Sequence, residues 1–167
     1  PQLMRILAIS PKEFSLLVSS YTFSAGIVGF AGAFFLDRFE RKRALQIIFA
    51  GFLAGTLACA FAPGYSLLMT ARILTGAFGG LLGSLILSII GDAIPIERRS
   101  SAMGIVMTAF SIASVVGVPA GLFLATHYSW HMPFLSIVFT GIFVQIAISK
   151  WGPIMKEHIK LQPEKRN

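Results

Sequence analysis

The chain has few charged residues and a single cysteine, and both shortages narrow the class of protein to which it belongs. Charged residues make up 13% of its 167 residues, about half the share expected in a soluble domain. Cys59 is the only cysteine, which excludes an internal disulfide and a cysteine-based metal site. Hydrophobic residues make up 55%, which excludes a disordered chain or an ordinary soluble enzyme. This composition indicates an integral membrane protein.

Five long apolar runs divide the chain. A helix needs about 20 apolar residues to cross a bilayer. The runs are apolar on every face and lack the alternation that a membrane β-barrel requires. We therefore predict an all-α integral membrane protein with five transmembrane helices, over residues 14–36, 44–62, 65–91, 100–126 and 132–149.

The net charge of +7 would suggest a nucleic-acid partner in a soluble protein. Here the basic residues lie in connectors, so we expect a lipid bilayer and no nucleic acid as the partner. Basic connectors face the cytoplasm, which predicts a cytoplasmic C-terminal tail. One side holds only Arg5 and Lys12. The other holds Arg38, Arg41, Lys42, Arg43, Arg98, Arg99, Lys150, Lys156, Lys160, Lys165 and Arg166.

Small residues recur at helical spacing in the runs, as in Gly26, Gly29 and Gly32. Such residues allow close helix packing in lipid. The same pattern gives three GxxxG pairs, Gly51–Gly55, Gly79–Gly83 and Gly117–Gly121. We expect close packing for most of these glycines. Trp130 and Trp151 fall at opposite membrane interfaces in this topology. We expect both to anchor helices there, as tryptophan commonly does.

Arg72 is a charge inside the third run, about eight residues from its start. An arginine in lipid is costly. Steps of four and three place Arg72 on one helix face with Gly76, Gly80 and Gly83. We predict that it faces an internal aqueous cavity; the alternative is that its side chain snorkels to the outer interface.

Two carboxylates end helices on the predicted cytoplasmic side. Asp37 lies beside Arg38, and Asp92 precedes Arg98. Acids beside arginines on one side of the membrane can form an ion-pair network that holds one conformational state and releases another. We predict such a network among these four residues, Arg41 and Lys42.

Polar residues on the first and fourth runs are candidates to line a substrate pathway. Each hydroxyl can equally bond its own helix backbone, and both interpretations stay open. The candidates are Ser20, Tyr21, Ser24, Ser111 and Ser114.

Several of these motifs resemble signatures of the major facilitator superfamily, in family order. Residues 33–43, with Asp37, Arg38, Arg41 and Lys42, resemble the loop signature between the second and third helices; Glu40 replaces a glycine. The segment from Arg72 to Gly76 resembles the fourth-helix signature, and residues 92–98 resemble the end of that helix. The segment with Gly117, Pro119 and Gly121 resembles the fifth-helix antiporter signature. Residues 130–134 resemble the entry to the sixth helix, with His131 in place of arginine.

The resemblance, closest to bacterial drug:proton antiporters and sugar-efflux permeases, implies a part of a twelve-helix transporter. Residues 1–13 would be an external stub after a missing first helix, residues 14–149 would be helices two to six, and residues 150–167 would begin the central cytoplasmic loop. It implies proton-coupled efflux of a small molecule by alternating access in the bacterial inner membrane. It also links Arg72 to proton coupling. The second six-helix half would be missing as well, so the fragment alone is expected to be inactive.

We expect no enzymatic activity, cofactor or metal. Two alternatives remain: a non-transporting, truncated helix bundle, and an intramembrane protease. A protease would use the two aspartates, or Ser84 with His127. Aspartates beside arginines are better explained as ionised salt-bridge partners than as a dyad that shares a proton.

Overall fold

The computed structural model describes residues 2–36 and 39–151, and side chains from residue 4 onward. The described residues form helices α1 (Gln2–Ile6), α2 (Pro11–Phe35), α3 (Arg41–Ala60), α4 (Tyr65–Ala93), α5 (Ile96–Ile112), α6 (Val118–His127) and α7 (Met132–Trp151). A short π-helical segment, η2 (Ala113–Gly117), joins α5 to α6. The five predicted transmembrane helices are confirmed as five helices long and apolar enough to span a membrane, with α5, η2 and α6 forming the fourth.

The ends of the helices differ from those of the apolar runs because local signals set them. At the start of α2, the Ser10 backbone N–H donates to Glu13 Oε2 (2.7 Å) and the Glu13 N–H donates to Ser10 Oγ (3.3 Å). This is a capping box, and Pro11 occupies the first helical position after it. At the end of α4, Ile94 is extended because the following Pro95 disfavours helical geometry in the residue before it.

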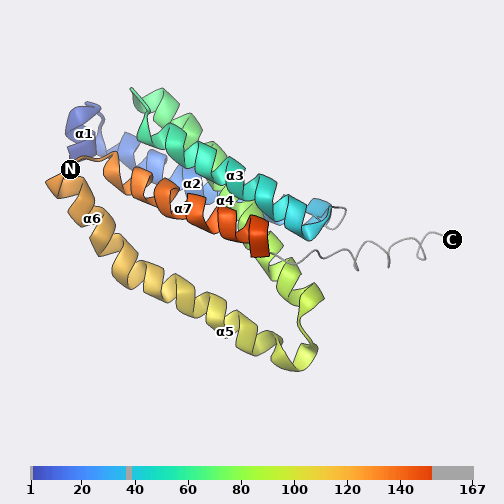
Figure 1. Cartoon of the computed structure of the whole chain (residues 1–167). Coiled ribbons are helices and arrows are strands. Elements are labelled where there is room, and N and C mark those ends of the chain that lie inside the picture. The colour runs from blue at the N-terminus through green and yellow to red at the C-terminus, as the bar shows by residue number, and fades with distance from the viewer. Residues whose placement is uncertain (1, 37–38, 152–167) are drawn as a thin grey trace.

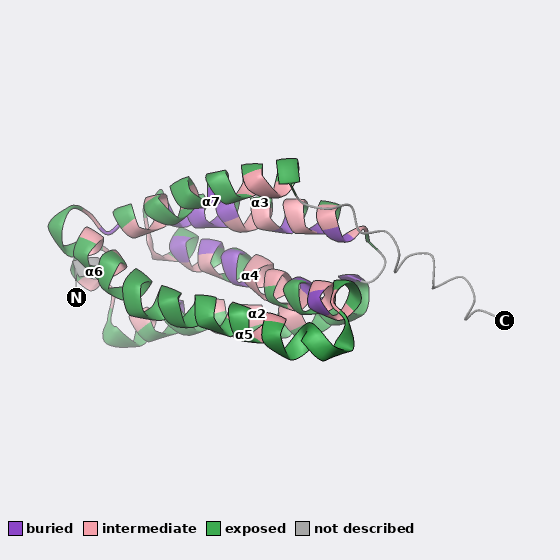
Figure 2. Cartoon of the chain, turned by 60° about the horizontal axis from the view of Figure 1, so that its bottom comes forward, coloured by how far each residue is buried: buried purple, intermediate pink, exposed green. Residues whose placement is uncertain are grey.

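Helices α2, α3, α4 and α7 pack side by side (Figure 1). The span formed by α5, η2 and α6 lies apart from them. α4 contacts α2 along one side and α3 along the other, and α7 packs on α3. The α5–η2–α6 rod contacts the rest mainly where it joins α4 and α7 at its two ends. Figure 2 shows this rod exposed along its length, whereas buried residues gather on α3 and α4.

Two clusters of buried side chains hold the four packed helices together. One contains Leu17, Cys59, Leu68 and Trp130, at the end where α3 stops and α4 and α7 begin. The other contains Leu36, Ala44, Ile48 and Leu85, toward the opposite end.

The predicted role of Trp130 as an interface anchor is corrected by its burial. Its side chain is 8% exposed and packs in the first cluster, so it joins helix ends within the protein and presents little surface to lipid. Trp151 is 80% exposed at the end of α7, a position that suits the anchoring prediction.

Candidate functional site

Arg41 joins α3 to α4 at the end of the bundle that holds the basic connectors. It is the first residue of α3, and its side chain is buried. Its Nε and Nη2 donate to Asp92 Oδ2 at 3.0 and 2.7 Å, and its Nη1 donates to the Leu36 carbonyl at 3.2 Å. Because α3 starts where α4 ends, the carboxylate lies near a positive helix terminus and the guanidinium near a negative one. This pair realises one contact of the predicted network.

The other network residues have different surroundings. Asp37 and Arg38 lie outside the described residues. Lys42 is half-buried and Arg98 is exposed; the Arg98 backbone N–H donates to the Pro95 carbonyl at 2.9 Å. No salt bridge from the side chain of Lys42 or Arg98 occurs within residues 2–36 and 39–151.

Arg99, which was not among the predicted site residues, binds the end of α4. Its Nε donates to the Ile94 carbonyl at 2.9 Å, and its Nη2 donates to the Gly91 carbonyl. Gly91 lies in the last turn of α4 and Ile94 is the residue that follows the helix. Carbonyl groups at this end lack helical partners, and a positive charge is favoured there. The basic tract after Pro95 could have suggested such a cap, but which arginine supplies it depends on the turn geometry.

Arg72 faces α2. Its guanidinium carbon lies 4.8 Å from the centroid of the Tyr21 ring, over the ring face. The side chain is half-buried. In the part of the chain that the structure describes, no carboxylate lies within salt-bridge distance of it. Tyr21 and Arg72, predicted separately as a lining residue and a cavity charge, are therefore neighbours on facing helices.

The glycines of α4 divide into packed and open positions. A Cβ added to Gly76 would collide with the Tyr21 carbonyl oxygen, and one added to Gly80 would collide with the Ala25 carbonyl oxygen. Both glycines therefore pack against α2, as predicted from the shared face. At Gly83, an added Cβ would meet nothing within 4 Å.

The other helices show the same division. Packing in the predicted sense occurs at Gly29, Gly32, Gly51, Gly55 and Gly79. At the remaining positions an added Cβ meets no atom within 4 Å, so no close packing occurs there among the described residues: Gly26, Gly83, Gly117 and Gly121.

The serine candidates mostly bond backbone. Ser20 donates to the Leu17 carbonyl, Ser111 to Met107 and Ser114 to Phe110, at 2.9, 3.1 and 2.9 Å. These bonds fit the backbone alternative left open for each hydroxyl. Ser24 differs because it donates to the Ile73 carbonyl of α4 at 2.7 Å, and so links two helices.

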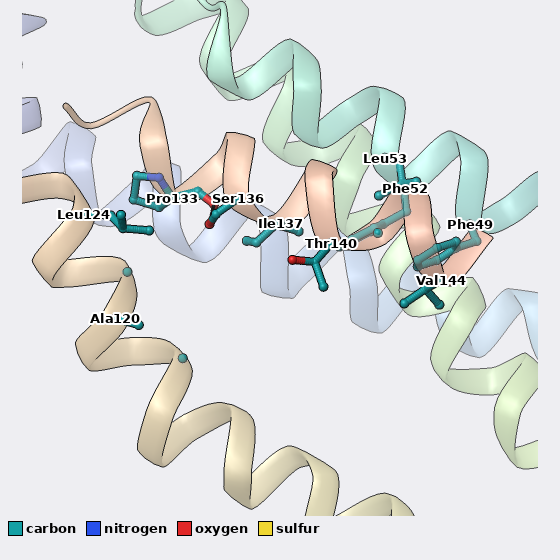
Figure 3. A pocket seen from close by; sticks show the side chains of 13 residues that line it. Phe49, Phe52, Leu53, Ala120, Leu124, Pro133, Ser136, Ile137, Thr140 and Val144 are labelled. Carbon is teal, nitrogen blue, oxygen red and sulfur yellow. Dashed lines mark hydrogen bonds between the residues drawn. The ribbon is translucent and has the colours of Figure 1, made fainter. Parts of the chain in front are cut away.

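The fifth-helix motif surrounds the irregular part of the fourth span. Pro119 is the second residue of α6, two residues after the end of η2. Proline lacks an N–H and its ring clashes with the carbonyl four residues earlier, which a wider π turn accommodates. Gly117 and Gly121 line one wall of an apolar cleft of about 400 Å³ between α3, α6 and α7. Figure 3 shows Ala120 and Leu124 of α6 facing Pro133 and Ile137 of α7 across this cleft.

Two polar contacts missed from the sequence link α7 to α3. His131, which replaces the arginine of the sixth-helix signature, makes a hydrogen bond through Nδ1 with the Ala60 carbonyl at the end of α3. Gln145 donates through Nε2 to the Gln46 carbonyl at 3.2 Å. Single polar residues within or beside apolar runs were the available signal, because lipid favours internal partners for them.

Among the described residues of the protease alternative, Ser84 and His127 make hydrogen bonds elsewhere and not with each other. Ser84 donates to the Gly80 and Leu81 carbonyls of its own helix. His127 contacts Thr126 and the Phe123 carbonyl at the end of α6. Asp92 is held by Arg41, in the ionised pairing expected of a structural carboxylate.

Comparison with known proteins identifies relatives of this arrangement. A family model described as the Major Facilitator Superfamily matches residues 1–167. The MFS-type transporter YhcA of Bacillus subtilis is 30% identical over 147 residues, which cover 88% of this chain and 28% of the relative. The inner membrane transport protein YdhP of Escherichia coli is 29% identical over 152 residues, which cover 89% of this chain and 38% of the relative. The chain thus spans less than two fifths of the length of either relative.

Proposed function

The chain belongs to the major facilitator superfamily, and from this membership we propose that it is part of a secondary active transporter that exports a small molecule in exchange for protons. Carriers of this family are generally not enzymes. The five spans would be helices two to six of twelve, in a bacterial inner membrane with the C-terminal tail in the cytoplasm. The position of Arg72, in an apolar span and against a neighbouring helix, is the observation that carries the coupling role.

An arginine at this depth is stable only if other interactions compensate for the free energy of placing its charge in lipid. The Tyr21 ring supplies part of this compensation, and water in a cavity or a carboxylate from the first helix or the second half would supply the rest. A guanidinium favours the ionised form of a nearby carboxyl group. Movement between outward-open and inward-open states would change their separation and so bind or release a proton.

The Arg41–Asp92 pair would hold one of the two states. It joins the ends of two spans on the proposed cytoplasmic side, and Asp37 and Arg38 would take part in the same network in the outward-open state. Opening toward the cytoplasm would require these contacts to rearrange. The fifth-helix residues Gly117, Pro119 and Gly121 would act in the antiporter role that the family resemblance implies.

Substitution of Arg72 tests the proposal in a full-length transporter that contains these residues, reconstituted in proteoliposomes. Under an imposed pH gradient, Arg72→Ala should abolish uphill accumulation while leaving the folded yield largely unchanged. Arg72→Lys should retain part of the activity because the charge remains but the planar guanidinium geometry is lost. Uphill transport by Arg72→Ala at the unsubstituted rate would make Arg72 a snorkelling interface residue and contradict the coupling role.

The exposed fourth span favours a second candidate for the chain taken alone, a helix bundle that does not transport. None of its most apolar window is buried within the described structure. Proteoliposomes that contain residues 1–167 should show no uptake or efflux beside the longer transporter measured in parallel. Transport by residues 1–167 alone would contradict this expectation.

A further inference from the structure

The ring of Tyr21 on α2 lies beside the charge of Arg72 on α4. The Arg72 guanidinium carbon sits over this ring at 4.8 Å from the centroid, within the range in which an aromatic face attracts a cation. In the described part of the chain, Arg72 has no hydrogen bond or ion pair with another side chain. The ring face is therefore the contact that orients the guanidinium.

Two glycines of α4 fix the position of this ring. Gly76 contacts the Tyr21 backbone, and a Cβ at Gly79 would lie 2.7 Å from the Tyr21 hydroxyl oxygen. Larger residues at either position would displace Tyr21 from α4. The hydrogen bond of 2.7 Å from Ser24 to the Ile73 carbonyl ties the next turn of α2 to the residue beside Arg72. Small residues on α4 and a cross-helix hydrogen bond on α2 thus set the geometry of the pair.

We propose that Tyr21 is the positioning residue for Arg72 and acts through the face of its aromatic ring. A guanidinium is planar and carries its N–H donors around its edge, so it can stack on a ring while those donors stay available for water or a carboxylate. The ring thereby holds the cation in place without neutralising it, as an acidic partner would. This inference rests on the proposed coupling role of Arg72. It adds a positioning role to the expectation that Tyr21 lines the substrate pathway.

The side chain of Tyr21 offers two other properties that could matter, its hydroxyl group and its bulk. Tyr21→Phe removes the hydroxyl and keeps the ring face, so uphill transport should stay near the unsubstituted level. Tyr21→Leu removes the face, and the rate of proton-driven accumulation should fall about tenfold. A large loss in Tyr21→Phe would assign the role to the hydroxyl and overturn the proposal.

Graded fluorination separates ring electrostatics from packing. Phenylalanine analogues with one, two and three fluorine atoms at position 21 of the full-length transporter keep nearly the same shape but progressively weaken the negative ring face. Uphill transport should fall stepwise along this series, and its pH dependence should shift, while thermal stability in detergent stays constant. The same analogues at Phe23, an exposed residue on α2, are the matched control and should leave transport unchanged.

The outcomes distinguish this inference from the proposal on which it rests. Uphill transport by Arg72→Ala at the unsubstituted rate removes the coupling role and the positioning role together. Loss of transport in Arg72→Ala with a flat fluorination series at position 21 leaves coupling intact and overturns only the role of Tyr21. A flat series together with a loss in Tyr21→Leu assigns Tyr21 to packing alone, which also overturns it.

Discussion

At the scale of single residues, burial distinguishes an arginine with a structural role from arginines that are exposed to solvent. The side chain of Arg41 is 3% exposed and that of its partner Asp92 is 37% exposed. Removal of the carboxylate would leave a cation with little access to water, whereas removal of the arginine leaves an acid that water can still reach. Breaking a buried ion pair costs about 3–5 kcal/mol when one charge is left uncompensated. Because Asp92 is partly exposed, we expect the cost of breaking this pair to lie toward the lower end of that range.

A double-mutant cycle measures the Arg41–Asp92 interaction directly. We expect Arg41→Gln and Asp92→Asn to couple by about 0.5–3 kcal/mol in the free energy of unfolding of the chain in detergent. Arg43 offers the matched control because it lies on the same helix, two residues after Arg41, and is exposed. It has no salt bridge in the described structure. Arg43→Gln with Asp92→Asn should be additive. Additivity in the Arg41 cycle as well would remove this pair from the proposed network.

At the scale of helices, close approach between α2 and α4 depends on particular glycines. Gly29 and Gly80 face each other across this contact: a Cβ at Gly29 would lie 2.9 Å from the Gly80 carbonyl oxygen. The nearest atoms are backbone on both sides, so they cannot move aside as a flexible side chain could. The resulting contact brings Tyr21 and Arg72 together.

Gly80→Ala should therefore separate α2 from α4 and lower the free energy of unfolding of the chain in detergent by about 1–3 kcal/mol. Gly83→Ala is the control on the same helix because an added Cβ there meets no atom within 4 Å. It should be neutral, or stabilising by up to about 1 kcal/mol from the helix preference of alanine over glycine. Equal effects of the two substitutions in thermal unfolding would show that the close approach is not a packing constraint.

At the scale of the whole molecule, the fourth span stands out because it contacts its neighbours mainly at its ends (Figure 1). The proposed transporter supplies the first helix and the second half as candidates to cover it. The two ends of the bundle are chemically different: one has the Arg41–Asp92 pair and Arg99, and the other has Trp130 and His131. This difference underlies the proposed orientation.

Cysteine labelling tests that orientation in the full-length transporter. With Cys59 replaced by alanine, a cysteine at Phe39, which is 59% exposed, should react with an impermeant reagent only from the cytoplasmic side. A cysteine at Tyr128, which is 69% exposed, should react only from outside, because basic connectors stay in the cytoplasm. The reverse pattern would invert the topology.

The five spans, their connectors and the assignment to integral membrane proteins could all be predicted from the sequence. These features depend on local properties, the length of each apolar run and the residues at its ends, and tertiary contacts barely alter them. The positions of the helix ends were less accurate, since the capping box of Ser10 and Glu13 extends α2 before its apolar run.

The pairing of distant residues was decided only by the tertiary structure. Apolar helices in lipid carry little directional pattern, so the sequence could place Arg72 at a depth but could not select the Tyr21 ring as its neighbour. For the same reason it could propose an ion-pair network but not show that Arg41 meets Asp92 across 51 positions. Gly80 and Gly83 are the same residue type on the same helix, and only the proximity of α2 makes Gly80 a packing site. Such choices depend on which helices become neighbours, because short-range contacts stabilise a pair only when the whole bundle brings its members together.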